Sequence, residues 1–184
     1  MPRTGRPIVE GQMMPAEREA LHEEVLANRP AHVLEVGCWR GGGSTYQIAT
    51  ALKKLGGGKL HTCETDKETI DRAYGAFQQT DLWPLVDFHP LPSHVLIQNL
   101  LAKGVIPNFI FFDGPEDPNV AMQDFQTLDA VVPSGTIFSM HDWLHDLSTK
   151  QKLLKPYLEG LATWKIYRLL VLPVSVGLVF ARKL

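Results

Sequence analysis

The sequence predicts an α/β fold: a doubly wound, mostly parallel sheet of seven strands that ends in a C-terminal antiparallel hairpin. Short apolar runs alternate with helical stretches of about 10 to 15 residues, as in β-α-β crossovers. A glycine-rich turn, Gly37 to Gly43, follows the first of these runs. The run Phe109–Phe112 is apolar at every position, which is typical of a central parallel strand covered on both faces.

The first half of the chain contains two such strand-and-helix units. The expected elements are a helix over Pro15–Ala27, a strand over Val33–Val36, a helix over Ser44–Leu55, a strand over Lys59–Glu64 and a helix from Asp66 to Phe77. Leu21 and Val25 are four positions apart, so they share one face of the first helix. We expect Ser44 to cap the second helix, and three glycines after Leu55 to end it.

The second half continues the pattern and then changes it. The expected elements are a strand over Val86–Leu91, a helix over Ser93–Lys103, a strand over Phe109–Phe112, a helix through Ala121, Phe125 and Leu128, a strand over Thr136–Met140, a helix near Lys150–Leu158, and strands over Trp164–Leu170 and Val176–Ala181. The last two strands are separated only by a short turn at Pro173, which predicts a hairpin and hence one antiparallel edge.

Composition limits the classes of function. The 184 residues fit one domain, 1–184, with a loosely ordered segment at 1–14. A net charge of -2 without basic runs argues against nucleic-acid binding. The most apolar tract, Leu169–Phe180, is too short to span a membrane, and no signal peptide is evident. We therefore expect a cytoplasmic protein in which Cys38 and Cys63 are free thiols.

Polar residues follow each predicted parallel strand. Ligands in such sheets bind outside the carboxyl ends of the strands, near the point where the strand order reverses. We therefore expect five segments to converge there: Glu35–Ser44, Glu64–Asp66, Leu91–His94, Asp113–Glu116 and His141–Trp143.

The segment Val33–Ser44, V-L-E-V-G-C-W-R-G-G-G-S, is the most informative motif. Its glycines allow the backbone to approach a ligand closely, and the helix that follows offers free N–H groups. Trp39 breaks the G-x-G-x-x-G pattern of dinucleotide sites, leaving acidic-x-Gly-x-x-x-Gly. A carboxylate at Glu35 would orient the amino group of an amino-acid-like cofactor, whereas it would repel a pyrophosphate. A tight turn without a ligand is the alternative.

The segment E-V-G-C-W-R-G-G-G-S resembles the cofactor loop of class I S-adenosylmethionine-dependent methyltransferases. The resemblance is to the metal-dependent small-molecule O-methyltransferases related to catechol and caffeoyl-coenzyme A O-methyltransferases, and it extends over nearly the whole chain. Glu10–Pro15 resembles the segment that these enzymes lay over the cofactor. The resemblance implies S-adenosylmethionine as the cofactor.

The resemblance also implies roles for single residues. Glu64 matches the acidic residue that holds both ribose hydroxyls; Asp66 is its rival, although capping the next helix suits Asp66 better. Ser93 and His94 match positions around the adenine. The expected cofactor-binding residues are Glu35, Gly37, Trp39, Gly41, Ser44, Glu64, Ser93, His94 and Asp113.

The family binds a divalent cation at the ends of its fourth and fifth strands, where this chain has Asp113, His141 and Asp142. Carboxylates suit Mg²⁺ or Mn²⁺, and an imidazole favours a softer ion such as Mn²⁺, Fe²⁺ or Zn²⁺. His141 is either a ligand or the general base. The catechol-type branch has a lysine base where this chain has Glu116, whereas a sugar and natural-product branch often ends its fifth strand in His-Asp, as here.

These observations predict an enzyme that methylates an oxygen of a small hydroxylated molecule with the help of a divalent metal. Asp113, His141 and Glu116 are the expected catalytic residues. Two alternatives stay open: a metal-independent methyltransferase with His141 or Glu116 as base, and a non-catalytic cofactor-binding module. Related enzymes often dimerise, so a homodimer is one expectation for this chain.

Overall fold

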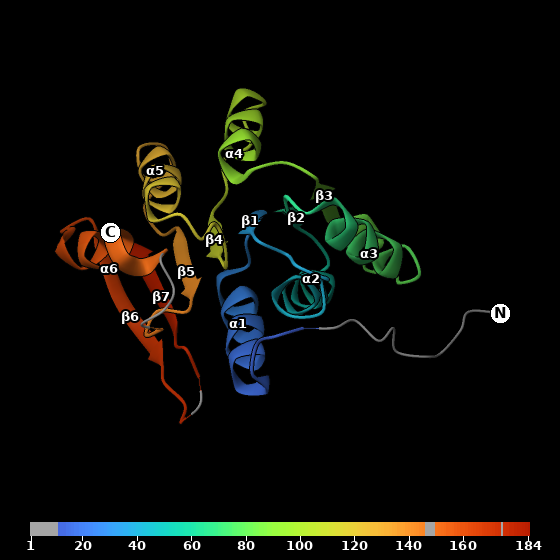
Figure 1. The fold of residues 1–184 in the computed structure, drawn as a ribbon, viewed down its shortest axis with the longest axis horizontal. Coiled ribbons are helices and arrows are strands. Elements are labelled where there is room, and N and C mark those ends of the chain that lie inside the picture. The colour runs from blue at the N-terminus through green and yellow to red at the C-terminus, as the bar shows by residue number, and fades with distance from the viewer. Residues whose placement is uncertain (1–10, 146–149, 174) are drawn as a thin grey trace.

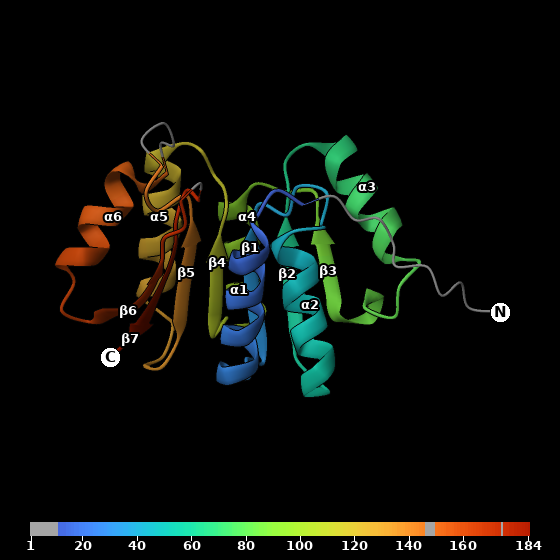
Figure 2. The same ribbon diagram turned by 90° about the horizontal axis from the view of Figure 1, so that it is seen from below.

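The computed structural model describes residues 11–145, 150–173 and 175–184. They form a seven-stranded sheet with helices on both faces (Figures 1 and 2). The strands are β1 (His32–Val36), β2 (Lys59–Cys63), β3 (Val86–His89), β4 (Phe109–Phe112), β5 (Ile137–His141), β6 (Trp164–Leu170) and β7 (Leu178–Lys183). The helices are α1 (Pro15–Asn28), α2 (Ser44–Leu55), α3 (Lys67–Phe77), α4 (Ser93–Ala102), α5 (Pro118–Asp129) and α6 (Gln151–Gly160), with a 3₁₀ turn, η1, at Trp83–Leu85.

The sheet order is β3-β2-β1-β4-β5-β7-β6. The first five strands are parallel, and β7 runs antiparallel to both β5 and β6. The predicted fold class and its C-terminal hairpin are therefore confirmed. The chain first builds outward from β1 to β3 and then returns to place β4 beside β1. This switch point leaves a crevice at the carboxyl ends of β1 and β4.

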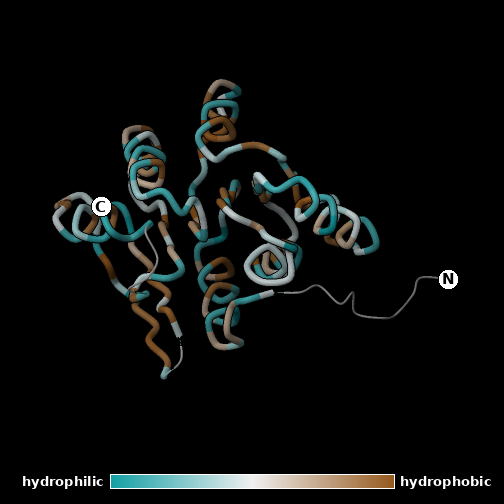
Figure 3. Tube along the Cα trace, viewed as in Figure 1, coloured by the Kyte–Doolittle hydropathy of each residue, from teal (hydrophilic) through white to brown (hydrophobic). Residues whose placement is uncertain are grey.

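Two apolar layers hold the helices to the sheet. On one face α1 and α2 cover Val33, Phe109 and Phe111. On the other face α4, α5 and α6 cover residues such as Ile110 and Phe138. Alternate residues of β4 point to opposite faces, so all four are buried, as its unbroken apolar sequence predicts. Hydrophobic and hydrophilic residues alternate along each helix, because one side of the helix packs on the sheet and the other faces solvent (Figure 3).

Several predicted boundaries differ from the structure, and three of these differences have a clear local cause. The third strand ends at His89 and not at Leu91, because the N–H of Leu91 turns back to donate to the carbonyl of His89. The last strand begins at Leu178, since Gly177 has a φ of 86°, outside the extended region. Ser44 is the first helical residue of α2, so Gly43 occupies the N-cap position expected for Ser44.

Within the described ranges, no helix combines the length and the apolar character that crossing a lipid bilayer requires.

Candidate functional site

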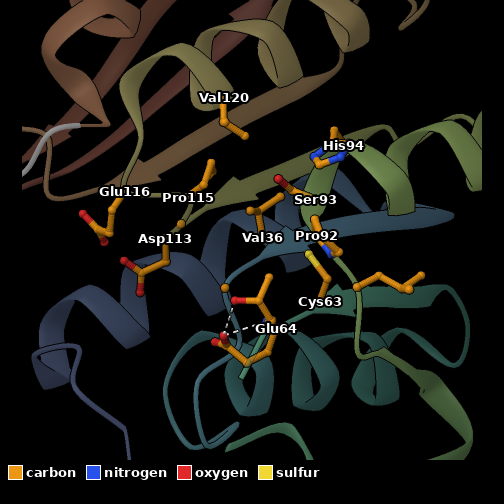
Figure 4. A pocket seen from close by; sticks show the side chains of 14 residues that line it. Val36, Cys63, Glu64, Pro92, Ser93, His94, Asp113, Pro115, Glu116 and Val120 are labelled. Carbon is orange, nitrogen blue, oxygen red and sulfur yellow. Dashed lines mark hydrogen bonds between the residues drawn. The ribbon is translucent and has the colours of Figure 1, made fainter. Parts of the chain in front are cut away.

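A cavity of about 490 Å³ opens at the carboxyl ends of β1, β2 and β4, where the strand order reverses (Figure 4). Four of the five predicted polar segments contribute to it. Its walls are formed by Val36, Gly37, Cys63, Glu64, Thr65, Leu91, Pro92, Ser93, His94, Asp113, Gly114, Pro115, Glu116 and Val120. The cavity therefore has an apolar interior and a few convergent polar side chains, as small-molecule sites commonly do.

Gly37 follows β1 and lies against Gly114, just after β4, beneath the cavity. Its φ is 87°, and a Cβ at this position would lie 2.9 Å from the backbone nitrogen of Gly114. The N–H groups of Asp113 and Gly114 both donate to the carbonyl of Val36, at 2.8 and 2.9 Å. Only glycine satisfies both the left-handed backbone and this close approach, so the predicted role of Gly37 has a clear steric basis.

The N-terminal segment lies against the glycine-rich loop. A Cβ on Gly11 would be 2.4 Å from the nitrogen of Gly43, so the two backbones are in direct contact. Arg18 fixes this segment from α1 by donating to the carbonyls of Gly11 and Met13, at 2.7 and 2.8 Å. The described part of the segment predicted to cover the cofactor thus packs on the loop.

Glu35 does not line the cavity, in contrast to the sequence prediction. It is fully buried under the loop, where one carboxyl oxygen accepts hydrogen bonds from Thr45 (2.8 Å) and Thr62 (2.6 Å). Burial raises the pKa of Glu35 to about 7, although hydrogen bonds from Ser44, Thr62 and Thr45 oppose the shift. Glu35 therefore connects β1 to α2 and β2 and has no direct access to a ligand in the cavity.

Glu64 has the position predicted for a ligand-binding carboxylate. Its Oε1 atom accepts from the N–H groups of Thr65 (2.8 Å) and Asp66 (3.2 Å), which fixes the side chain at the cavity wall. Within the described ranges, Oε2 of Glu64 has no hydrogen-bond or ion-pair partner. Asp66 instead caps α3 by accepting from the N–H of Thr69 at 2.8 Å. The structure therefore confirms Asp66 as the cap of α3, and it leaves the Glu64 carboxylate at the cavity wall.

Ser93 and His94 lie at the opposite wall, at the start of α4. Ser93 is buried, and its hydroxyl donates to Asp124 of α5, a buried carboxyl whose pKa burial raises. The wall is therefore anchored to the neighbouring helix. No motif in the sequence indicated Asp124, because it lies in the middle of an ordinary amphipathic helix.

Trp39, Gly41 and Ser44, also predicted to bind the cofactor, do not line this cavity. A Cβ on Gly41 would be 3.0 Å from the ring of Phe77 and 3.3 Å from Ala73, so Gly41 permits close packing against α3. Trp39 has a φ of 44° and stacks under the guanidinium of Arg40. The loop therefore contributes its first glycine to the cavity and its later residues to packing.

A cluster of charged residues adjoins the cavity at Asp113. His141 lies 3.2 Å from Asp113 and 3.2 Å from Asp142, so the structure brings the three predicted metal-binding residues together. Two further members were not predicted. The buried carboxylate of Glu17, from α1, lies 3.2 Å from Nε2 of His141. The ammonium of Lys150 lies 2.6 Å from Asp142 and 3.2 Å from Asp113.

Two basic residues of this cluster, His141 and Lys150, have raised pKa values. Burial alone would lower the pKa of His141, but hydrogen bonds with Asp113 and Glu17 outweigh it and raise the pKa to about 10. Burial likewise opposes the charge of Lys150, and the carboxylates of Asp113 and Asp142 raise its pKa. Both side chains are therefore cationic near neutral pH, which argues against His141 as the general base.

The residues present do not fit the predicted divalent cation. Hard cations bind carboxylate oxygens at about 2.0 to 2.6 Å, and an ion held by Asp113 and Asp142 would need the volume that the Lys150 ammonium fills. The acidic residues of this cluster already have a positive partner.

Comparison with known proteins agrees with this architecture. The model of a methyltransferase domain family matches residues 34–143, well over half of the chain. No curated protein sequence matches significantly.

Solved structures resemble the fold at low sequence identity. An O-methyltransferase from Bacillus cereus in complex with SAH has a TM-score of 0.79 at 18% identity, with 94% of this chain and 82% of that chain covered. TomG from Streptomyces achromogenes, an O-methyltransferase of tomaymycin synthesis in complex with SAM, has 0.77 at 17%, covering 94% and 81%. The SAH-bound methyltransferase PaMTH1 from Podospora anserina has 0.71 at 18%, covering 94% and 80%.

Proposed function

The chain belongs to the methyltransferase domain family, and from this premise we propose that it transfers the methyl group of S-adenosylmethionine to an oxygen atom of a small molecule. The observation that carries the proposal is the cavity at the switch point, with Glu64 fixed at its wall. The cofactor is also the one bound, as SAM or SAH, in the Bacillus, Streptomyces and Podospora neighbours.

The residues around the cavity fit this cofactor. A ribose offers two neighbouring hydroxyls, and Glu64 presents a carboxylate whose Oε1 is already held by two backbone N–H groups. The apolar side chains of Leu91, Pro92 and Val120 suit the faces of an adenine ring, and His94 lies beside them. When bound, S-adenosylmethionine supplies a methyl group activated by its sulfonium. The chain's task is to place an acceptor oxygen in line with that group.

The acceptor side of the site lies at Asp113 and Glu116. Both line the cavity, and the Glu116 side chain is 73% exposed at its rim. A hydroxyl acceptor has to lose its proton during transfer, and a carboxylate at the rim is in a position to receive it. We assign this role to Glu116, since His141 lies outside the cavity wall and already holds its proton.

Binding of S-adenosylhomocysteine (SAH), measured by calorimetry, tests the cofactor assignment. Glu64→Ala removes the ribose contacts, and hydrogen bonds to a charged partner contribute about 1.5 to 3 kcal/mol, so affinity should fall about 10- to 100-fold. Glu68→Ala is the matched control, because Glu68 pairs with Arg72 on the exposed face of α3. Its affinity should equal that of the wild type.

Two results would contradict the proposal. Unchanged SAH affinity in Glu64→Ala would remove the ribose assignment, and a wild-type protein that binds no SAH would remove the cofactor. The transfer itself is measured by mass spectrometry with S-adenosylmethionine and a panel of phenols, catechols, sugars and amines. A product heavier by one methyl group on oxygen is expected, and a product methylated on nitrogen would replace the proposed acceptor class.

A further inference from the structure

Lys150 immediately precedes α6, and its side chain is almost completely buried among acceptors. Its ammonium donates to Asp142 Oδ2 at 2.6 Å, to the backbone carbonyl of Asp113 at 2.7 Å and to Asp113 Oδ1 at 3.2 Å. An ammonium has three donor hydrogens, so these contacts use its full capacity. The Glu116 carboxylate lies slightly farther away, at 3.9 Å.

The acceptors of Lys150 are oxygen atoms of the kind that a hard divalent cation prefers. They comprise two carboxylates and one carbonyl, and they belong to the two strand ends that meet beside the cavity. Asp142, the residue that follows β5, also has a φ of 63°, in the left-handed region. A non-glycine residue in this conformation is uncommon and occurs often at functional sites.

We propose that the Lys150 ammonium replaces a divalent cation at this site, so that the protein excludes metal ions from Asp113 and Asp142 and acts without them. The inference rests on the proposed function, since it takes this cluster as the acceptor side of a methyl-transfer site. A fixed positive charge beside Asp113 offsets the two carboxylates and favours an acceptor oxygen that is losing its proton. Unlike a metal ion, it is part of the chain and is present in every molecule.

A variant that lacks the Lys150 ammonium should differ from the wild type in its affinity for metal ions. Without the ammonium, the carboxylates of Asp113 and Asp142 would keep, within the described part of the chain, only His141 as a cationic partner. Removing one partner of a buried ion pair leaves an uncompensated charge and destabilises the fold. A divalent cation added from solution would then relieve the repulsion, so the variant should gain a metal site that the wild type lacks.

The test is Mn²⁺ binding to the whole 184-residue chain. Binding is measured by calorimetry and by the change in Tm when the metal is added. Five proteins are compared: wild type, Lys150→Met, Asp142→Ala, the double variant Lys150→Met/Asp142→Ala, and Lys152→Met. Lys152 is an exposed lysine of α6, so its variant controls for the loss of one positive charge. Methionine keeps much of the length and apolar volume of the lysine stem.

The proposal expects Mn²⁺ to leave the Tm of wild type and Lys152→Met unchanged, and to raise that of Lys150→Met by several degrees. The Lys150→Met protein should bind Mn²⁺ at least about tenfold more tightly than the wild type, and the double variant should lose this gain. If Lys150→Met does not fold alone, refolding with Mn²⁺ decides: recovery supports the proposal, and failure to recover contradicts it.

Two outcomes would overturn the inference. One is Mn²⁺ binding by the wild type that is lost in Asp142→Ala, since the ammonium would then not exclude the metal. The other is a folded Lys150→Met protein that gains no Mn²⁺ binding, because Lys150 would then be an ordinary buried ion-pair partner. Neither outcome bears on SAH affinity, which is measured separately, so failure of this inference is distinguishable from failure of the proposed function.

Discussion

Two acidic residues that close neighbouring strands have opposite environments. Glu35, one residue before the end of β1, is completely buried, and its carboxyl is held by threonine hydroxyls. Glu64, just after β2, is held by backbone N–H groups at the wall of the cavity. Both follow apolar residues near the end of a strand, so the sequence pattern does not show that one is buried and the other lines the cavity. Their difference arises because alternate strand residues point to opposite faces, whereas the loop beyond the strand has no such constraint.

The raised pKa of Glu35 predicts a pH-dependent stability. In the unfolded chain its carboxyl ionises near 4.5, and in the folded protein near 7, so the native state binds the extra proton between these values. Stability therefore falls as the pH rises through this window. Relative to Glu35→Gln, the wild type should lose up to about 3 kcal/mol of unfolding free energy between about pH 5 and 8.

Urea denaturation of wild type and Glu35→Gln across this pH range measures the difference. Glutamine preserves a carbonyl acceptor for Thr45 and Thr62 and removes only the titration. A difference between the two proteins that stays constant with pH would show that Glu35 ionises in the folded protein as it does in the unfolded chain.

Among the secondary-structure elements, helices α2 and α3 are capped differently, and this difference determines which residues of the preceding loops remain available to the cavity. The first residue of α2 is Ser44 and its N-cap is Gly43, without a side-chain cap, so the loop before it keeps its backbone close to Gly11. Helix α3 begins differently, because Asp66 caps it with its own carboxylate. The chain therefore uses one acidic residue, Asp66, for the helix and leaves the other, Glu64, at the cavity wall.

This division of roles predicts the behaviour of Asp66→Ala. The variant loses the N-cap hydrogen bond to Thr69 and should lower Tm by about 2 to 4 °C. Its SAH affinity should remain that of the wild type, which is the reverse of the pattern expected for Glu64→Ala. Thermal denaturation and calorimetry on the same preparations make the comparison. A loss of affinity without a loss of stability would exchange the two assignments.

For the molecule as a whole, the reactivity of the two cysteines shows whether the folded structure around the sheet is closed or open. Both are free and buried: Cys38 lies against α3, and Cys63 ends β2 beneath the cavity. Burial raises the pKa of Cys63 to about 12 and that of Cys38 further above its ordinary range. Burial is the largest cause of both shifts and nearby carboxylates such as Glu35 and Glu64 add to it, so neither thiol resembles an activated nucleophile.

Labelling with a thiol reagent therefore measures opening of the structure. A pKa near 12 in place of 9 leaves about a thousandfold less thiolate at mildly alkaline pH. We expect native protein to label slowly at both positions, with rates that rise with urea in parallel with unfolding. SAH should slow the labelling of Cys63 further, because this residue lines the cavity. Rapid labelling without denaturant would show that this end of the sheet opens locally.

Local patterns in the sequence predicted the fold class, the hairpin at the edge of the sheet and four of the segments that line the cavity. Each depends on short-range patterns: the unbroken run Phe109–Phe112, the glycines after β1, and polar residues such as Glu64 and Asp113 directly after apolar strands. Periodicity and glycine spacing are local properties, and the handedness of β-α-β crossovers converts them into one arrangement.

Which charged side chains come into contact depends on how elements far apart in the sequence pack together. Glu17 and Lys150 come from elements that are 133 positions apart in the chain (150 − 17), and both reach the cluster around His141 and Asp113. The sequence predicted a metal site from Asp113, His141 and Asp142, and it could not show that the Lys150 ammonium contacts both aspartates. Ion pairs form wherever packing places opposite charges together, and packing between distant elements leaves no periodic signal along the chain.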